Sequence, residues 1–307
     1  MNDCGLRVNY SSLPPLNFLG LSPEESGLDV SRVLLLPVPY EATTSYGGGT
    51  KNGPQAILAA STQVELYDRE YGGEMARRWG IHTLPPLAPE FAGPEAMVQA
   101  ISEAVTDYGG RGKLLGILGG EHTVSVGVAR ALSQLYGDFV TVQLDAHADL
   151  RSEYDGTPYS HACAARRILD YSPLMQLGIR SLDISEAEFI RDNPGRVTTV
   201  FADEMQDRKE YLALLADKIR GRSVYLTLDL DVFDPAVMPA VGTPEPGGLF
   251  WYDVLEIVRT VAAHSRVLAF DVVELAPIPG FHAPDFTAAK LVYKIINAVL
   301  SAADGQK

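Results

Sequence analysis

Six side chains of the types that bind metal ions occur in three short stretches of this 307-residue sequence. Two of the stretches alternate a polar residue with an apolar one. In an extended chain, residues two positions apart face the same side, so these polar side chains can converge. In the third stretch, two glycines permit a tight turn just before the candidate ligand. The six candidates, in chain order, are His122, Asp145, His147, Asp149, Asp229 and Asp231.

The number of candidate ligands indicates the number of metal ions. Two imidazoles and four carboxylates are too many for one tetrahedral zinc site. Four carboxylates buried together without cations would be prohibitively unfavourable, whereas their charge matches two divalent cations. A carboxylate-rich set with some imidazole suits manganese, with nickel, cobalt and iron as alternatives. Two metals about 3.5–4 Å apart can share a water and lower its pKa toward neutrality, which is machinery for hydrolysis.

Each stretch alone has a simpler interpretation. An aspartate at a strand end is often a helix cap or a turn former. A single histidine such as His122 is more often an ordinary polar residue. Three separate strand ends that all carry ligands are much harder to explain in this way. Other catalytic motifs are absent from the sequence, which has no G-x-S-x-G elbow, no P-loop and no G-x-G-x-x-G.

Each stretch follows a short apolar run, and eight such runs alternate with helical patterns. Most runs are continuously apolar, as strands buried on both faces should be. The runs are Val33–Val38, Trp79–Leu84, Lys113–Leu118, Phe139–Leu144, Leu174–Ile179, Val197–Phe201, Ser223–Leu228 and Arg266–Val272. The helical patterns are Ala96–Tyr108, Val124–Tyr136, Lys209–Arg220, the segment from Trp251, and Ala288–Leu300. This alternation predicts an α/β fold with a parallel sheet, whose ligands bind beyond the carboxyl ends of the strands.

Composition narrows the class of protein. The 39 acidic and 25 basic residues give a formal net charge of −14, which argues against a nucleic-acid partner and is compatible with a cationic substrate. Two cysteines, Cys4 and Cys163, fit a reducing compartment. We see no signal peptide and no apolar stretch near the ~20 residues that cross a bilayer, so we expect a soluble, cytoplasmic protein with no membrane partner. We expect one domain over residues 1–307, with an irregular N-terminal segment of about 25 residues.

Several motifs together resemble the signatures of the ureohydrolase family, which contains the arginases and agmatinases. They are Gly-Gly-Glu-His at 119–122, Asp-Ala-His-Ala-Asp at 145–149, Leu-Asp-Leu-Asp-Val-Phe-Asp-Pro at 228–235, Asp-Val-Val-Glu-Leu-Ala-Pro at 271–277, and the Gly-rich run Thr44–Ile57. The resemblance extends from about residue 34 to residue 299. It implies a three-layer α/β/α fold with a parallel sheet of about eight strands, two Mn²⁺ per chain, and a homo-trimer or homo-hexamer.

The resemblance also assigns roles. One metal would be held by His122, Asp145, Asp149 and Asp229, and the other by Asp145, His147, Asp229 and Asp231. Asp145 and Asp229 would be shared by the two metals. Glu274 would anchor the substrate guanidinium, for which a carboxylate is the natural bidentate partner. His161 would pass a proton to the leaving amine.

The loop Leu150–Ser160 should select the substrate, and it resembles that of the agmatinase group. Glu153 and Asp155 could meet a terminal ammonium or could be solvated loop charges, and Arg151 could recognise a carboxylate. We therefore predict hydrolysis of agmatine to putrescine and urea, a step of polyamine biosynthesis. Guanidinobutyrate, aminopropylagmatine and arginine are alternative substrates. A non-catalytic member of the fold, or a deacetylase with one zinc, is the alternative of a different class.

Overall fold

The computed structural model describes residues 16–305, and its centre is one eight-stranded parallel sheet. The strands lie in the order β4, β1, β5, β10, β9, β6, β7, β8. Their bounds in that order are Ile81–Thr83, Val33–Val38, Leu114–Gly119, Arg266–Val273, Ser223–Asp229, Val140–Leu144, Leu174–Ile179 and Val197–Phe201. Every neighbouring pair is parallel. The predicted parallel sheet is confirmed, and each expected strand lies within two residues of its apolar run.

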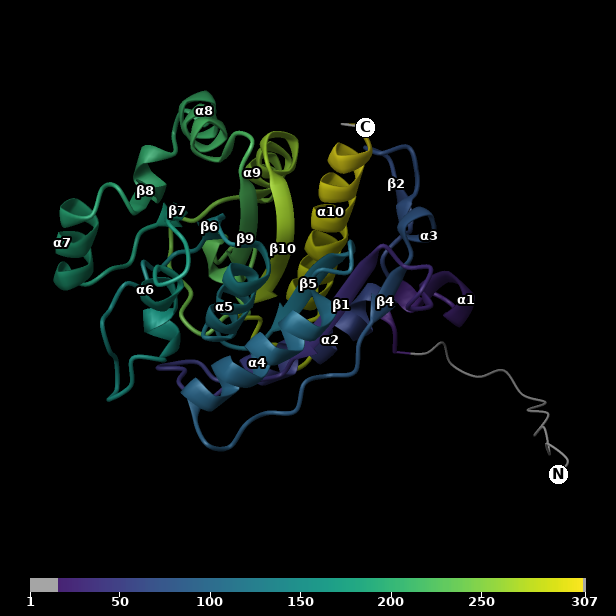
Figure 1. Ribbon diagram of the computed structural model, residues 1–307, viewed down its shortest axis with the longest axis horizontal. Helices are drawn as coiled ribbons and strands as arrows, with labels where there is room; N and C mark the ends of the chain where they lie inside the picture. The colour runs from purple at the N-terminus through teal and green to yellow at the C-terminus, as the bar shows by residue number, and fades with distance from the viewer. Residues whose placement is uncertain (1–15, 306–307) are drawn as a thin grey trace, which may run out of the picture.

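Helices cover both faces of the sheet, so the protein has three layers (Figure 1). One face carries α2 (Gly53–Ser61), α8 (Arg208–Ile219), α9 (Trp251–His264) and α10 (Ala283–Gly305). The other face carries α4 (Pro94–Tyr108), α5 (Val124–Tyr136) and α6 (Ala164–Ile168). Because both faces are covered, most strand residues are buried, which explains why the strands read as continuous apolar runs.

The C-terminal helix α10 corrects one expectation from the sequence. It has 23 residues and is long and apolar enough to cross a membrane by length and composition. However, 61% of its most apolar window is buried inside the protein, where it packs against α2, α9 and the sheet. A core helix explains this composition, because a helix covered by neighbouring elements is apolar around most of its circumference.

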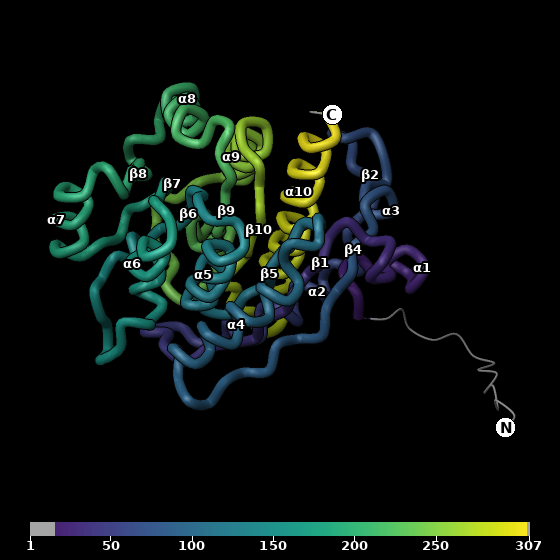
Figure 2. Tube along the Cα trace, in the orientation of Figure 1, coloured from purple at the N-terminus to yellow at the C-terminus, as the bar shows by residue number. Residues whose placement is uncertain are grey.

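Short elements complete the fold. They are η1 (Phe18–Gly20), α1 (Pro23–Ser26), η2 (Thr50–Asn52), β2 (Tyr67–Asp68), β3 (Gly73–Glu74), α3 (Met75–Trp79), η3 (His161–Cys163), α7 (Ile184–Asp192), η4 (Ala202–Glu204) and η5 (Leu230–Val232). Of the N-terminal segment expected to be irregular, residues 1–15 lie outside the described residues, and η1 and α1 occupy part of the remainder. In Figure 2 the connection between β4 and α4 runs as a long open loop along the edge of the molecule.

The sheet order places the chemically interesting residues together. Strands β5, β10, β9 and β6 are consecutive neighbours at the centre of the sheet. Since all four are parallel, their carboxyl ends meet at one edge. The chain segments at and after these four ends carry all six candidate ligands and Glu274. The topology therefore builds the site that the spacing predicted.

Candidate metal centre

The first group of side chains surrounds His122, just before α5. Its Nδ1 lies 3.0 Å from Asp145 Oδ2, 3.2 Å from Asp149 Oδ2 and 3.3 Å from Asp229 Oδ2. All four residues are buried. Despite these short distances, Nδ1 has no hydrogen-bond partner among the described residues. An imidazole nitrogen and three carboxylate oxygens therefore converge on one point.

The second group surrounds His147, in the loop after β6. Its Nδ1 lies 2.8 Å from Asp231 Oδ2 and 3.8 Å from Asp145 Oδ1. Asp145 therefore contributes to both groups, as expected for a shared ligand. Asp229 presents Oδ2 to His122, while its Oδ1 accepts a hydrogen bond from the Asp231 backbone N–H at 2.9 Å. The structure thus brings together all six candidate ligands. Five of them form two overlapping clusters that could each hold a metal ion, and Asp229 adjoins these clusters through His122 and Asp231.

The electrostatics of the two groups favour a bound cation. Burial and the nearby Asp231 raise the pKa of Asp145 to about 7. Burial, Asp231 and Asp145 likewise raise the pKa of Asp229. Burial lowers the pKa of His147, but the attraction of Asp231 outweighs it and raises that pKa to about 11. Without metal, the cluster would have to take up protons to offset carboxylate repulsion, and divalent cations would remove that need.

The donor set fits two divalent metals. The unpartnered, buried Nδ1 of His122 is the clearest sign, because an orphaned polar atom at such a site calls for a ligand. The first group offers one nitrogen and three oxygens, and the second offers one nitrogen and at least two oxygens. Such oxygen-rich sets suit manganese better than zinc.

Two non-glycine residues at the site have a left-handed backbone. The φ angles are 52° at Asp149 and 66° at Glu274. Asp149 is a candidate ligand in the segment after β6, Glu274 directly follows β10, and both side chains line the same cavity. Such conformations cost free energy and cluster at functional sites, so their presence here supports this location as the active site.

Glu274 and His161 lie together beside the first group. Glu274 Oε1 accepts a hydrogen bond from the backbone N–H of His122 at 2.7 Å and lies 3.7 Å from His161 Nδ1. Burial lowers the pKa of His161, but pairing with Glu274 outweighs it and raises that pKa to about 9. The protonated form of His161 is therefore favoured beside Glu274, and its role in passing a proton to the leaving amine stays a prediction.

His161 is held by a short chain of hydrogen bonds that begins at Glu121. The backbone N–H of His161 donates to Thr43 Oγ1 at 2.9 Å. The Thr43 hydroxyl and backbone N–H donate to Glu121 at 2.8 and 2.7 Å. Glu121 thus ties the loop after β1 to the segment that carries His161.

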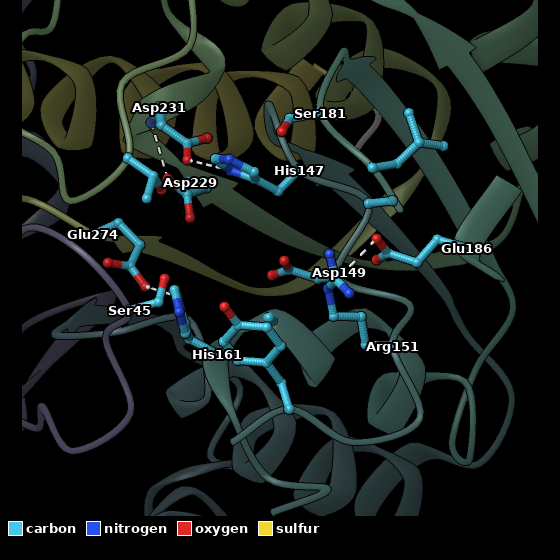
Figure 3. A pocket seen from close by; sticks show the side chains of 15 residues that line it. Ser45, His147, Asp149, Arg151, His161, Ser181, Glu186, Asp229, Asp231 and Glu274 are labelled. Atoms are coloured by element: carbon cyan, nitrogen blue, oxygen red, sulfur yellow. Dashed lines mark hydrogen bonds and ion pairs between the residues drawn. The ribbon is translucent and has the colours of Figure 1, made fainter. Parts of the chain in front are cut away.

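A cavity of about 180 Å³ is lined by His161, Glu274 and four of the candidate ligands, namely His147, Asp149, Asp229 and Asp231 (Figure 3). Glu274, His161 and Ser45 lie at one end, and Glu186 and Arg151 lie at the opposite end. The cavity also has five polar lining residues to which the sequence assigned no individual role, namely Ser45, Tyr154, Ser181, Glu186 and Thr243. Of these, only Glu186 has a readable signal, because it forms a capping box with Asp183 at the start of α7. That signal predicts a helix start and says nothing about a cavity.

In the loop after Asp149, the structure distinguishes between the two alternatives left open for Glu153 and Asp155, and it favours solvated loop charges. Glu153 and Asp155 are exposed and do not line the cavity. The reason is a tight turn in which Tyr154 and Thr157 pair, and Asp155 at its tip has a φ of 49°. The turn directs both acidic residues away from the cavity, so neither can meet the substrate in this conformation.

Arg151 lines the cavity, but other side chains engage its guanidinium. Its Nη1 lies 3.5 Å from Asp183 Oδ2, its Nε lies 3.8 Å from Glu186 Oε2, and it stacks over Tyr154. At this end of the cavity, which we call the distal end, the guanidinium of Arg151 therefore lies between two carboxylates. A substrate carboxylate would have to compete with both of them for Arg151.

Comparisons with known proteins agree with this geometry. The arginase family model matches residues 31–297. An N(1)-aminopropylagmatine ureohydrolase from Synechocystis sp. is 39% identical over 92% of this chain and 94% of its own length. One from Thermus thermophilus is 37% identical over 89% and 92%. The solved agmatine ureohydrolase of Thermoplasma volcanium is 30% identical, with a TM-score of 0.80 over 92% and 94% of the two chains.

Proposed function

Because the chain belongs to the arginase family, whose relatives are hydrolases of C–N bonds in linear amidines, we propose that it hydrolyses a guanidino compound with a cationic tail. The products would be urea and an amine. The observation that carries this proposal is the cavity, where metal-ligand side chains face Glu274 and His161 across one small volume.

Two metals would be held by the six predicted ligands, with Asp145 common to both positions. Manganese is the proposed metal, on the strength of the oxygen-rich donor set. When bound, such a pair supplies a water of lowered pKa close to the guanidinium carbon. The carboxylates of Asp145 and Asp229 are then fully charged and need no protons.

The protein's own side chains would orient the substrate and move the proton. Glu274, with a carboxylate oxygen facing the cavity, would pair with the planar guanidinium and fix its carbon in place. His161 lies beside Glu274, and its buried Nε2 has no hydrogen-bond partner among residues 16–305. A protonated His161 would donate to the leaving amine nitrogen as the C–N bond breaks.

A cationic tail fits the remaining walls of the cavity. Besides the metal ligands, the lining contains the carboxylates of Glu274 and Glu186, and the one arginine among the described lining residues, Arg151, is paired with acidic neighbours. An amine-bearing tail could pair with the carboxylate of Glu186 there, whereas an added carboxylate would be repelled unless it displaced the partners of Arg151. This favours agmatine and its longer relatives over arginine and guanidinobutyrate.

Among the amine-tailed candidates, the relatives favour the longer one. The two N(1)-aminopropylagmatine ureohydrolases are 39% and 37% identical to this chain, against 30% for the solved agmatine ureohydrolase. We therefore propose N(1)-aminopropylagmatine together with agmatine as substrates. In either case the enzyme would serve polyamine biosynthesis, and agmatine would yield putrescine. We also propose a cytoplasmic homo-trimer or homo-hexamer.

The test is urea release from a panel of guanidino compounds after manganese loading. The panel contains agmatine, N(1)-aminopropylagmatine, arginine and 4-guanidinobutyrate. The two amine-tailed compounds should give the highest kcat/KM. Urea from none of them, at full metal loading, would favour a non-catalytic member of the fold and would contradict the proposal.

A further inference from the structure

The imidazole nitrogen of His122 that faces away from the three aspartates, Nε2, begins a chain of buried hydrogen bonds that ends at a carboxylate. This nitrogen lies 3.0 Å from Thr227 Oγ1. The Thr227 hydroxyl donates to Ser125 Oγ at 3.2 Å, and the Ser125 hydroxyl donates to Asp271 Oδ2 at 2.7 Å. Thr227, Ser125 and Asp271 are all 0% exposed. We call these three residues the relay.

The relay joins three elements that build the site. Thr227 is on β9, two residues before the candidate ligand Asp229. Ser125 is in the first turn of α5, and Asp271 is on β10 directly opposite Thr227 in the sheet register. The relay therefore spans neighbouring strands and the helix that covers them, and its geometry is fixed by the fold.

The direction of each hydrogen bond follows from the end of the relay. Asp271 also accepts from the Tyr225 hydroxyl and from the Leu228 backbone N–H. Although burial raises the pKa of Asp271, these hydrogen-bond donors favour its ionised carboxylate, which can only accept. Ser125 has one hydroxyl hydrogen, which it gives to Asp271, so its oxygen accepts from Thr227.

The direction of the hydrogen bond between Thr227 and His122 follows in the same way. Thr227 gives its single hydroxyl hydrogen to Ser125, so its oxygen must accept from His122 Nε2–H. The proton of a neutral His122 is thereby placed on Nε2. This leaves the lone pair of Nδ1 facing Asp145 and Asp149, where a metal would bind.

We propose that Asp271 is a positioning residue that sets the affinity of the metal position at His122, acting through Ser125 and Thr227. The proposal rests on the metal-dependent function proposed above. Groups that orient a ligand histidine typically change metal affinity by ~10–100-fold. The effect should be confined to one position, because the relay contacts His122 Nε2, whereas His147 Nε2 lies 3.9 Å from Glu245 Oε1, beyond hydrogen-bonding distance.

The chain offers a matched control for this proposal. Thr141 is a fully buried threonine on the adjacent strand β6, and its hydroxyl lies 2.6 Å from Ser172 Oγ. Thr227→Val and Thr141→Val therefore each remove one buried threonine–serine hydrogen bond. Only Thr227 touches a ligand histidine. Thr227→Ser keeps the hydroxyl and serves as the rescue variant.

The experiment is a Mn²⁺ titration of the metal-free full-length chain, with free Mn²⁺ counted by electron paramagnetic resonance. The parent, Thr141→Val and Thr227→Ser should show the same two binding constants. Thr227→Val and Asp271→Asn should weaken one of the two by ~10–100-fold and leave the other unchanged. If Asp271→Asn fails to fold, Ser125→Ala breaks the same relay and should give the same shift.

Two results would contradict the proposal that the relay sets metal affinity at His122. One is a Thr227→Val isotherm identical to that of Thr141→Val. The other is an equal weakening of both positions in Thr227→Val and not in Thr141→Val, which would indicate a general loss of structure. Because the titration needs no substrate, a parent that binds two Mn²⁺ but releases no urea would refute the proposed function while the relay is still tested.

Discussion

The two ends of the cavity are built differently. At the metal end, side chains arrive from the ends of central strands, are buried, and have oxygens engaged at short range, as where Asp145 Oδ1 accepts from the His147 backbone N–H at 2.7 Å. At the distal end, Arg151 meets Asp183 and Glu186 at 3.5 and 3.8 Å, and both Arg151 and Asp183 are about a third exposed. We therefore expect the metal end to specify the reaction and the distal end, whose ion pairs are longer and more exposed, to select the substrate.

The largest effect should come from removing a ligand at the metal end. Asp145→Ala or Asp229→Ala should lose metal and nearly all activity, since each removes a carboxylate from the first metal position and Asp145 also serves the second. A lost Lewis acid removes several kcal/mol of transition-state stabilisation, or roughly 10³-fold or more in rate. Elemental analysis and urea assays of the variants measure this. Full metal content in either variant would contradict the prediction that these carboxylates bind the metals.

The next largest effect separates proton transfer from metal binding. His161→Ala should keep both metals, because His161 is not within either ligand cluster. Turnover should fall by roughly 10²–10⁴-fold if the imidazole donates to the leaving amine. The readout is kcat at a metal content matched to the parent. Unchanged turnover would show that His161 has no part in the reaction.

A smaller effect should appear when the far end of the substrate changes. Agmatine should be preferred over arginine by about 10²-fold or more, because a mismatched desolvated charge costs several kcal/mol. The guanidinium end is the same for both, so selectivity must arise at the distal end. The measurement is kcat/KM for both compounds at identical metal loading. Equal kcat/KM values would mean that the distal carboxylates do not discriminate between agmatine and arginine.

The smallest effect should come from Arg151. Partly exposed ion pairs are worth only about 0–1 kcal/mol, so Arg151→Ala should change kcat/KM for amine-tailed substrates by less than about tenfold. A competing outcome would be informative. If 4-guanidinobutyrate is the best substrate and Arg151→Ala abolishes that advantage, the agmatinase-type assignment is wrong although the ureohydrolase chemistry stands.

The same contrast explains what could be predicted from the sequence. The strands were predictable because both sheet faces are covered, as in the fully buried run Val33–Val38. Five of the six candidate ligands were predictable because a period of two places them on one side of an extended chain, and His122 was predictable because two glycines permit a tight turn just before it. Helix α7 was not predicted, since it has only nine residues, its first residue, Ile184, is 73% exposed, and Phe189 and Ile190 pack against the core only while partly exposed.

The distal end could not be predicted because its contacts depend on loop conformation. The pairing of Arg151 with Glu186 joins residues 35 positions apart, on a loop and a helix that no short motif links. The outward turn of Asp155 depends on a left-handed backbone that the sequence permits but does not require. The relay was missed for a similar reason, since only the register of β9 and β10 places Asp271 beside Thr227.

The most direct test of the account is urea release measured against the number of Mn²⁺ bound per chain. Metal-free protein is reconstituted stepwise, and bound metal and kcat are determined on each sample with agmatine and with N(1)-aminopropylagmatine. The account predicts that activity reaches its maximum at two metals per chain. A maximum at one metal per chain, or no urea at two, would contradict it.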